Sequence, residues 1–483
     1  MTERRLSDLL RRPLGVDPAI RGVTADSRQV RPGFLFAALP GATADGRAFV
    51  AAALAAGAVA ILAEAPVEAA GVPVVTVSDA RRAYALAAAA FRGAQPGTCV
   101  AVTGTNGKTS VAVFCRQIFE RLGHSAASMG TLGVRAGDEQ ITGPGMTTPD
   151  AGDVARLLAE LAARGVTHLA LEASSHGIDQ RRLDAVVLTA AGFLNLTQDH
   201  LDYHGTMQAY RAAKLRLFEQ LLPRGRTAVL NADSDAYPAF AAAAVASGHS
   251  VLSVGAMGEG LTLVSRGLCP EGQRLKIAAG GRGFEVLLPL AGAFQGANAL
   301  AAAGLCIAAG EECEAVLGAL EHLEGARGRM QRVGRGPAGG EAYVDYAHTP
   351  DGLRTVLMAL RPHARGRLMV VFGAGGDRDR GKRPQMGAIA ASLADVAIVT
   401  DDNPRSEAPG AIRAEILAGA AGLEEIGDRR EAIRAAAALL RDGDVLVVAG
   451  KGHEQDQVVG SEILPFDDVA EIAAALALEA ADG

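Results

Sequence analysis

The chain has 483 residues, of which 49% are hydrophobic and 21% charged, and this length predicts a globular protein of about three domains. Its net charge of −7 at pH 7 argues against a general nucleic-acid binder, because such proteins offer clustered cationic side chains to phosphates. The five cysteines are scattered and form no Cys-x-x-Cys pair, which gives no thiolate zinc site and suits a reducing compartment. With no apolar leader and no unbroken apolar span, we expect a cytoplasmic protein that does not insert into membranes.

Short apolar runs alternate with alanine-rich helical patterns along the chain, which predicts α/β domains with mostly parallel sheets. We expect a smaller N-terminal α/β domain, a central P-loop-type sheet with helices on both faces, and a C-terminal Rossmann-like domain. Linkers at 95–97 and 325–328 give the predicted domains 1–95, 96–327 and 328–483. Predicted strands lie at 34–39, 59–62, 99–102, 169–172, 369–372, 397–400 and 445–448, with a helix near 48–56.

Residues 102–110, Val-Thr-Gly-Thr-Asn-Gly-Lys-Thr-Ser, predict a site for a nucleoside triphosphate. A glycine-containing turn between a buried strand and a helix lets backbone N–H groups converge on phosphate oxygens. Lys108 would reach the β- and γ-phosphates, and the Thr109 hydroxyl would bind Mg²⁺. The common motif has a further glycine where this chain has Val102, so we interpret the loop as a shortened variant anchored on Gly104. The alternative is a structural turn with an incidental lysine.

Two segments of the central domain carry acids or imidazoles directly after apolar runs. Glu172 ends a strand, where it could hold Mg²⁺; a helix cap or an exposed turn acid would fit the same position. Residues 195–205 group imidazoles with carboxylates. His200 and His204 would share a face only in a helix, and Gly205 favours a loop. We therefore interpret this segment as a second-metal or water-positioning element rather than a zinc site.

Lys214 lies on the apolar stripe of a helix that begins near Met207, four residues from both Tyr210 and Phe218. The pattern alone favours a lysine whose amine extends to solvent. The alternative is a buried amine of depressed pKa that reacts with carbon dioxide.

Three charged loops follow the predicted strands of the C-terminal domain, at 373–384, 401–407 and 450–454. Open α/β sheets bind ligands at the carboxyl ends of their strands. Arginines for carboxylates and acids for ammonium groups predict a zwitterionic amino-acid substrate.

In order along nearly the whole chain, these motifs resemble those of the Mur ligases. The matching segments are 26–28, 103–109, 147–149, 172–177, 199–205, 213–214, 328–330, 345–350, 375–384, 402–405 and 450–454. The motifs are most similar to those of members that add meso-2,6-diaminopimelate to UDP-N-acetylmuramoyl-L-alanyl-D-glutamate during peptidoglycan synthesis. Lysine-adding members lack the arginine that matches Arg405, which could clamp the extra carboxylate of diaminopimelate. Gln295, Ala374 and Met146 depart from the common family residues.

The resemblance implies a role for each matching residue. Catalysis would rest on Lys108, Glu172, His200 and Lys214. Thr109, Glu172, His200 and a carbamylated Lys214 would hold Mg²⁺. ATP, a co-substrate, would contact Gly104, Thr105, Asn106, Gly107, Lys108, Thr109, Ser110, Asn298, Arg329, Asp345 and His348. The UDP-sugar dipeptide would contact Ser27, Thr147, Thr148, Ser174, Gln180 and Arg182. Diaminopimelate would contact Arg380, Asp402, Asn403, Pro404, Arg405, Gly450 and Glu454.

The expected reaction is ATP-dependent amide ligation through an acyl phosphate, catalysed by a monomer whose partners are these small molecules. Because an acyl phosphate hydrolyses readily, we expect separate domains to close over it. The alternatives are a lysine-adding or folate-type ligase, a P-loop kinase, and a non-catalytic nucleotide-binding regulator.

Overall fold

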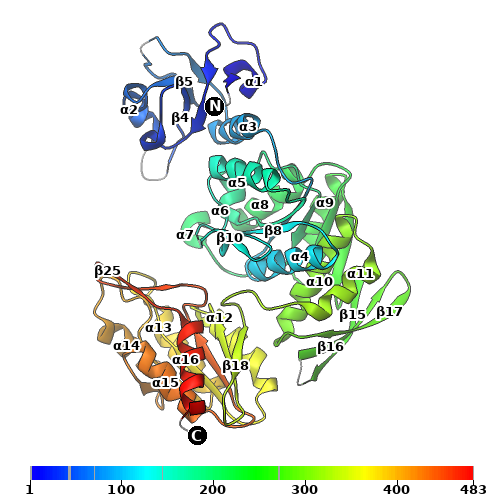
Figure 1. Cartoon of the computed structure of the whole chain (residues 1–483), viewed down its shortest axis with the longest axis vertical. Coiled ribbons are helices and arrows are strands. Elements are labelled where there is room, and N and C mark those ends of the chain that lie inside the picture. The colour runs from blue at the N-terminus through cyan, green and yellow to red at the C-terminus, as the bar shows by residue number, and fades with distance from the viewer. Residues whose placement is uncertain (1–2, 42–44, 70, 144, 270–271, 482–483) are drawn as a thin grey trace. The chain divides into compact units, whose positions relative to one another are not determined.

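Parallel β-sheets covered by helices build the chain (Figure 1), which confirms the predicted α/β class. The computed structural model describes residues 3–41, 45–69, 71–143, 145–269 and 272–481. Its residues divide into two compact units. The first unit comprises residues 1–262 and 300–319, and the second comprises 263–299 and 320–483.

The N-terminal part of the first unit is a small parallel sheet of order β3-β4-β5-β6. Alternate residues of its strands pack against α1 and α3 on one face and against α2 on the other. The sheet contains β3 (Gly22–Thr24), β4 (Phe34–Ala37), β5 (Ala58–Ala63) and β6 (Val74–Thr76), and β1 (Arg4–Arg5) and β2 (Ala19–Ile20) form a separate antiparallel pair. Its helices are α1 (Leu6–Leu10), η1 (Ser27–Gln29), η2 (Gly46–Phe49), α2 (Val50–Ala55) and α3 (Ala80–Arg92).

The central sheet of the first unit runs in the order β10-β9-β8-β11-β7-β12-β13-β14. Strands β8, β11, β7, β12, β13 and β14 are parallel, so their carboxyl ends share one edge. The strands are β7 (Thr98–Thr103), β8 (Ala126–Gly130), β9 (Gly133–Ala136), β10 (Glu139–Thr142), β11 (His168–Glu172), β12 (Ala190–Phe193), β13 (Thr227–Asn231) and β14 (Ser250–Gly255).

Helices cover both faces of this sheet, which explains why its strands are continuously apolar. Cys99 and Ala101 of β7 belong to one apolar cluster, together with residues of α5, α6 and α9. Helix α4 packs against β7, β8 and β11. The helices are α4 (Lys108–Arg121), α5 (Ala151–Ala163), α6 (Ser175–Asp179), α7 (Leu201–His204), α8 (Met207–Arg216), η3 (Leu217–Leu221), α9 (Tyr237–Ala246) and α11 (Cys313–Ala319).

Helix α10 (Ala293–Ala308) passes from the second unit into the first at residue 300. Strand β15 (Leu261–Cys269) also begins in the first unit, where its first residues pair with β14. The second unit then contains the antiparallel pair β16 (Gly272–Ala279) and β17 (Arg282–Leu288), followed by η4 (Leu320–His322).

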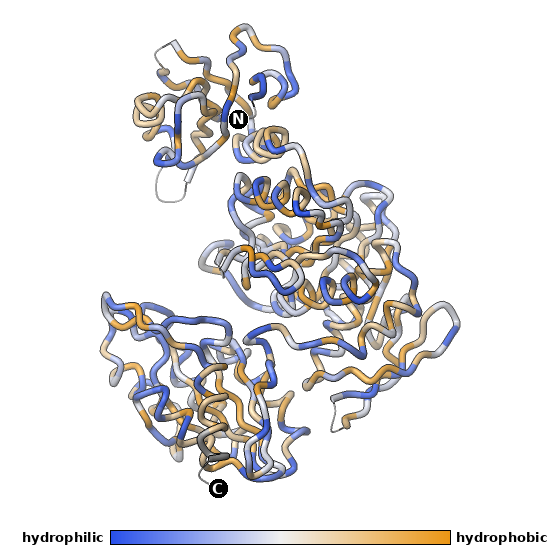
Figure 2. The backbone as a smooth tube through the Cα atoms, in the orientation of Figure 1, coloured by the Kyte–Doolittle hydropathy of each residue, from blue (hydrophilic) through white to orange (hydrophobic). Residues whose placement is uncertain are grey.

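The C-terminal sheet has the order β18-β19-β23-β20-β21-β22 and is parallel except for β18. Its central strands are apolar along their length (Figure 2) and pack under α12 to α14 on one face and α15 and α16 on the other. The strands are β18 (Gln331–Arg335), β19 (Glu341–Asp345), β20 (Leu368–Phe372), β21 (Val396–Val399), β22 (Glu424–Glu425), β23 (Val445–Ala449), β24 (Asp456–Val459) and β25 (Glu462–Pro465). The helices are α12 (Pro350–Leu360), η5 (Arg361–His363), α13 (Lys382–Leu393), α14 (Pro409–Leu417), α15 (Arg429–Leu439) and α16 (Asp468–Ala481).

The predicted strands are found with small shifts in their ends. The strand expected at 34–39 stops at Ala37, and the helix expected at 48–56 divides into η2 and α2. Among the described residues, none of the helices combines the length and apolar sequence needed to cross a bilayer.

A fully buried ion pair joins the two helices on one face of the C-terminal sheet. Both nitrogens Nε and Nη2 of Arg429 donate to the Asp468 carboxylate at 2.7 Å, and Nη2 also donates to the Ala449 carbonyl at 3.0 Å. We expect Arg429→Met to lower the free energy of unfolding by about 3–5 kcal/mol, because it leaves a carboxylate buried without its partner. The adjacent Arg430→Met is the matched control, since the Arg430 pair with Glu471 is partly exposed and contributes about 0–1 kcal/mol. Urea unfolding of both variants measures the difference; equal losses would contradict the assignment.

Candidate active site

The phosphate loop, residues 104–107, connects β7 to α4 as the motif predicts. Gly107 has φ 88°, a left-handed conformation that a glycine adopts without strain. A Cβ at Gly104 would lie 2.9 Å from the Cβ of Leu194, so only glycine fits there. The Asn195 side-chain oxygen accepts hydrogen bonds from the backbone N–H groups of Thr105 (3.1 Å) and Asn106 (2.9 Å). The loop is therefore held in one shape by a side chain from the neighbouring strand end.

Lys108 folds back over the loop at the N-terminus of α4. Its amine donates to the carbonyl oxygens of Gly104 (2.9 Å) and Thr105 (2.8 Å). Thr109 and Ser110 follow in the first turn and are buried. The cationic amine and the positive end of the helix dipole together favour an anion at this point.

Glu172 ends β11, the strand between β7 and β8, and it is only 3% exposed. Its Oε2 accepts a hydrogen bond from the Thr109 hydroxyl (3.0 Å), and its Oε1 accepts one from the Thr131 N–H (2.8 Å). A side chain at Gly130 would overlap this carboxylate. The alternatives of an exposed turn acid and a helix cap are wrong, because Glu172 is buried and Ser174 caps α6.

The Glu172 carboxylate and the Thr109 hydroxyl form a pair of hard oxygen donors beside the phosphate loop. This is the donor chemistry that Mg²⁺ prefers, usually completed by water and phosphate oxygens. The residues present therefore fit a Mg²⁺ ion.

Lys214 is buried, with 1% of its surface exposed, so the expectation that it extends to solvent is wrong. Its amine donates to the Gly104 carbonyl at 2.7 Å and lies 4.5 Å from the centre of the Tyr210 ring. Burial, followed by the positive charge of Lys108, lowers the pKa of Lys214 well below its usual value. A buried amine of low pKa is neutral and nucleophilic.

The segment after β12 forms a helical turn, α7, where the sequence favoured a loop. His200 precedes this turn with φ 53°, and Gly205 ends it with φ 73°. The His200 ring lies 4.8 Å from the His176 ring and 6.1 Å from that of Tyr210, measured between centroids. Tyr210 therefore contacts the amine of Lys214 on one side and faces His200 on another. The loop expectation was wrong because Gly205 acts as the helix C-cap rather than as a breaker.

Five of the six residues predicted to bind the UDP-sugar dipeptide lie around the end of β11. The Thr148 hydroxyl donates to the Glu172 carbonyl (2.9 Å) and accepts from the Ser174 N–H (3.1 Å). Arg182 donates to the Thr148 carbonyl (2.6 Å) and to the Gln180 side chain (2.8 Å). Thr147 is tied to Thr131 by a hydroxyl pair at 2.9 Å. Ser27 lies in η1 of the N-terminal sheet, a turn that Asp26 caps through the Arg28 N–H (2.9 Å).

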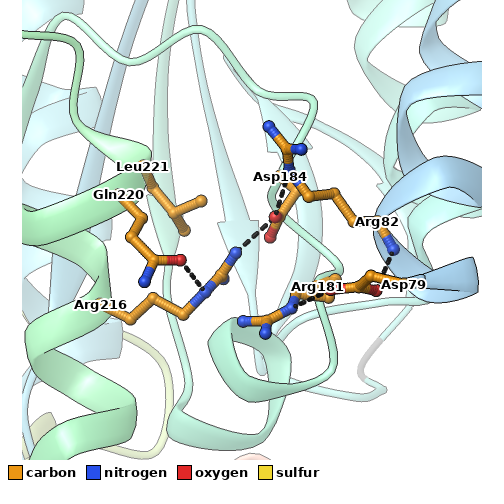
Figure 3. A pocket seen from close by; sticks show the side chains of 7 residues that line it. All are labelled: Asp79, Arg82, Arg181, Asp184, Arg216, Gln220 and Leu221. Carbon is orange, nitrogen blue, oxygen red and sulfur yellow. Dashed lines mark hydrogen bonds and ion pairs between the residues drawn. The ribbon is translucent and has the colours of Figure 1, made fainter.

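A charged cavity of about 390 Å³ lies between α3 and the segment after α6 (Figure 3). Arg181 donates to Asp79 at 2.9 Å, Arg216 is paired with Asp184, and Arg82 lies 3.6 Å from the same Asp184. The three arginines exceed the two aspartates by one charge, and these ion pairs join the N-terminal sheet to the central sheet.

The remaining predicted ATP contacts lie in the second unit. Gln295 accepts a hydrogen bond from Asn298 (3.0 Å) and donates to the Arg329 carbonyl (3.4 Å). The Arg329 guanidinium stacks 4.4 Å from the centre of the Tyr346 ring. Asp345 accepts from the backbone N–H groups of residues 330 (2.7 Å) and 347 (2.8 Å), and burial raises its pKa. The departure at Gln295 thus keeps an amide that links α10 to the residues before β18.

His348 follows β19 and is exposed. The Nδ1 atom of His348 lies 2.9 Å from the Tyr346 carbonyl oxygen, and the Lys382 amine donates to the backbone carbonyl of His348 at 2.8 Å.

The three charged loops of the C-terminal domain lie at one edge of its sheet, as predicted. They follow β20, β21 and β23, which are parallel neighbours. The Gly376 N–H donates to the Asn403 carbonyl at 2.9 Å, which joins the first two loops. Asn403 donates to the Glu454 carboxylate at 2.7 Å, which joins the second and third.

A buried carboxylate, Asp402, and a half-buried one, Glu454, mark the centre of this edge. Asp402 is buried, and its Oδ2 has no hydrogen-bond partner among the described residues. A Cβ at Gly450 would lie 2.5 Å from this oxygen, and Gly450 has φ 118°. The fully buried Lys451 amine lies 3.4 Å from Glu454 and donates to the Asn403 side chain at 3.0 Å. An unsatisfied buried carboxylate oxygen is suited to an ammonium group.

Arg405 lies three residues after Asp402 in the same loop and has φ 52°. Its Nη1 donates to the Gly376 carbonyl at 2.8 Å, and its backbone is held by the Val458 carbonyl at 3.0 Å. The preceding Pro404 is buried. Arg380 is more exposed and pairs with Glu407 at 2.8 Å. Arg405 thus has a fixed backbone and a planar donor group that can receive a carboxylate.

The sequence matches three domain models of one family, each described as a Mur ligase. These are the Mur ligase family catalytic domain over residues 19–92, the Mur ligase middle domain over 102–306, and the glutamate ligase domain over 328–452. This chain belongs to the Mur ligase family.

Relatives of this Mur ligase span its whole length. It is 70% identical over 479 residues to UDP-N-acetylmuramoyl-L-alanyl-D-glutamate–2,6-diaminopimelate ligase of Caulobacter vibrioides, covering 98% of this chain and 99% of that protein. It is 47% identical over 461 residues to the ligase of the same name from Zymomonas mobilis, covering 95% of each. A solved structure of a ligase of that name superposes with TM-score 0.75 at 34% identity, covering 99% of this chain and 100% of that chain.

A more distant solved structure shares only the fold. Mycobacterium tuberculosis folylpolyglutamate synthase complexed with ADP superposes with TM-score 0.65 at 18% identity, covering 83% of this Mur ligase and 94% of that chain.

Sequence reasoning missed several residues that hold the site of this Mur ligase in place. Asn195 fixes the phosphate loop, Thr131 fixes Glu172, and Lys451 compensates Glu454. Asn195 lies just after β12, and Lys451 lies in the charged loop after β23. These positions at strand ends could have identified both residues from the sequence. Thr131 carries no comparable signal, because it acts mainly through its backbone N–H.

Proposed function

We propose that this Mur ligase joins meso-2,6-diaminopimelate to the D-glutamyl side chain of UDP-N-acetylmuramoyl-L-alanyl-D-glutamate, with conversion of ATP to ADP and phosphate. The names of its full-length relatives support the substrates. The structural observation that carries the proposal is an unsatisfied Asp402 oxygen in the same strand-end loop as the Arg405 guanidinium. An amino acid with an additional carboxylate matches both charges.

The first step transfers the γ-phosphoryl group of ATP to the side-chain carboxylate of the D-glutamyl residue. One carboxylate oxygen forms a bond to phosphorus, the bond from phosphorus to the β-γ bridging oxygen breaks, and ADP leaves. Lys108 and the positive end of the α4 dipole stabilise the negative charge that spreads over the phosphates. Catalysis in this step is a matter of positioning and electrostatics.

Thr109 and Glu172 would hold one Mg²⁺ ion, and His200 with a carbamylated Lys214 would hold a second. Such ions neutralise charge on the phosphates and on the developing acyl phosphate. Carbamylation joins the neutral Lys214 amine to carbon dioxide with loss of one proton, which converts a buried amine into a carboxylate. The lowered pKa of Lys214 supports this modification, because only an unprotonated amine attacks carbon dioxide.

The second step forms the amide. The free amine of diaminopimelate attacks the acyl carbon and a tetrahedral intermediate forms. Phosphate then leaves with the oxygen that joined it to carbon, and the proton lost from the nitrogen ends on the phosphate. Asp402 and Glu454 would bind the ammonium group at the far end of diaminopimelate, and Arg405 would bind the carboxylate beside it. The Mur ligase would thereby select diaminopimelate over lysine, which has no second carboxylate.

Glu172→Gln is expected to raise the Mg²⁺ concentration for half-maximal activity by about tenfold or more, because the amide keeps the shape but removes the charge. Phosphate release measured against Mg²⁺ concentration checks this. Glu120→Gln is the control, since Glu120 lies on α4 and pairs with Arg116. An unchanged Mg²⁺ requirement in Glu172→Gln would remove Glu172 from the metal site.

The function itself is tested by phosphate release from ATP in the presence of the UDP-sugar dipeptide, comparing meso-diaminopimelate with L-lysine. We expect release that requires the dipeptide and strongly prefers diaminopimelate. Preference for lysine would overturn the specificity. A phosphorylated dipeptide without phosphate release would indicate a kinase, and no turnover would indicate a regulator.

The cytoplasmic location and the monomeric state predicted from the sequence belong to the same proposal. ATP and the UDP-linked substrate are soluble, charged molecules, which agrees with a cytoplasmic enzyme.

A further inference from the structure

Three side chains with metal-binding atoms meet at the edge of the central sheet opposite to Glu172. His168 begins β11 and Glu172 ends it, so four strand steps, about 13 Å, separate the two. His124 follows α4, and Glu311 follows α10. One ligand atom from each of these three residues lies within 4.8 Å of the others. This group, the His124–His168–Glu311 cluster, has no part in the proposed ligation.

The backbone fixes all three positions. His124 and Glu311 each follow a left-handed glycine that ends a helix. The His124 N–H donates to the Phe119 carbonyl at 3.0 Å, and the Glu311 N–H donates to the Cys306 carbonyl at 3.1 Å. The His168 N–H donates to the carbonyl of residue 125 at 3.1 Å. These backbone hydrogen bonds fix where the chain places His124, His168 and Glu311, so the fold brings the three residues together.

Thr167 sets the tautomer of His168. The Thr167 hydroxyl donates to the Ser125 carbonyl at 3.1 Å, so its oxygen is left to accept from Nδ1–H of His168 at 2.9 Å. Nε2 of His168 then carries a lone pair and faces Oε1 of Glu311 at 3.6 Å. A lone pair that faces a carboxylate oxygen is repelled unless a cation lies between them.

Two of the three ligand-atom separations, both to Glu311, are close to those around a small tetrahedral ion. Nε2 of His124 lies 2.9 Å from the same Oε1 of Glu311. Metal–ligand distances of about 2.0–2.1 Å place tetrahedral ligand atoms about 3.3 Å apart, and the two observed separations lie on either side of that value. The Phe119 ring, 4.7 Å from the His168 ring, forms an apolar wall that holds the imidazole in place.

We propose that His124, His168 and Glu311 form a site for one transition-metal ion of the zinc class, with water as the fourth ligand. Two imidazoles and one carboxylate favour Zn²⁺ or Co²⁺ over Mg²⁺, which prefers oxygen ligands. The ion connects the C-terminal ends of α4 and α10 to the start of β11. Because α4 begins with Lys108 and β11 ends with Glu172, the site stabilises the two elements that carry the phosphate-binding residues.

The test is titration of the chelator-treated, full-length protein with Zn²⁺ by calorimetry, with Mg²⁺ in large excess to occupy oxygen-rich sites. A parallel titration with Co²⁺ measures the visible absorption that a tetrahedrally bound Co²⁺ ion shows. His124→Ala and Glu311→Gln remove one ligand each, and Thr167→Val removes the tautomer-setting hydroxyl. His322→Ala, a histidine of η4 outside the cluster, is the matched control.

We expect wild type and His322→Ala to bind one equivalent of Zn²⁺ that raises the Tm, and Co²⁺ to give a tetrahedral spectrum. In the two ligand variants the affinity falls by about 100-fold or more, and in Thr167→Val by about tenfold. Metal-free variants that melt at the wild-type Tm establish that they are folded. Absence of Zn²⁺ binding to wild type, or binding that both ligand variants retain, would overturn the proposal.

Discussion

Replacing Lys214 by alanine is expected to lower the rate of phosphate release by about 10²- to 10³-fold, with partial recovery when a short carboxylic acid such as acetate is added. The removal of one preorganised charged group from a phosphoryl-transfer site has an effect of this size. Recovery is expected because the truncation leaves a space beside Tyr210 and Gly104 in which a small carboxylate can replace the carbamate.

Two variants separate this chemical role from a structural one. Lys214→Met keeps the length of the side chain and leaves no space for acetate, so we expect low activity without recovery. Lys276→Ala, on the exposed side of β16, should retain wild-type activity. Full activity of Lys214→Ala without additive would contradict the role of Lys214. A loss in Lys214→Ala that acetate leaves unchanged would assign Lys214 to holding the Gly104 carbonyl instead.

Replacing Arg405 by alanine is expected to raise the KM for diaminopimelate by about 100-fold while the KM for ATP stays within a factor of about two. Truncating one partner of a charged hydrogen-bonded pair costs about 2–5 kcal/mol, which corresponds to this range. Arg405→Lys should recover only part of the loss, because an ammonium group cannot form the two parallel hydrogen bonds of a guanidinium. Initial-rate kinetics with each substrate varied in turn gives both constants.

The control for Arg405 is Arg354→Ala, which removes an exposed arginine of α12 in the same domain. It should leave both Michaelis constants unchanged. If Arg405→Ala had the wild-type KM for diaminopimelate, the proposed clamp would be wrong, whereas an equal rise in both constants would indicate damage to the domain. Relief of the discrimination against L-lysine in Arg405→Ala would support the clamp directly.

The sequence was sufficient to predict features that depend on local patterns. The strand, glycine turn and helix around Lys108 follow from apolar periodicity and glycine placement, and the structure contains them. The three charged loops were placed at one sheet edge because they follow parallel strands. In each case, local spacing and strand polarity determine the arrangement without knowledge of distant contacts.

The features that could not be predicted from the sequence depend on contacts between distant segments. Burial of the Lys214 amine requires the Gly104 carbonyl, 110 positions away, as its acceptor. The fixing of the phosphate loop by Asn195 likewise joins the end of β12 to the loop after β7. The helical turn α7 was not predicted because Gly205, which follows its last residue, is compatible with either a loop or a helix C-cap. Residue spacing alone does not distinguish these cases.

The measurement that tests the ligase mechanism most directly uses dipeptide substrate labelled with ¹⁸O in both oxygens of the D-glutamyl side-chain carboxylate. Phosphate and product are then analysed by mass spectrometry after a reaction with ATP and meso-diaminopimelate. An acyl phosphate predicts one ¹⁸O in the released phosphate, one ¹⁸O in the new amide, and a product that has gained diaminopimelate less one water. Unlabelled phosphate, with no amide product, would mean that water attacks ATP directly and would contradict the account.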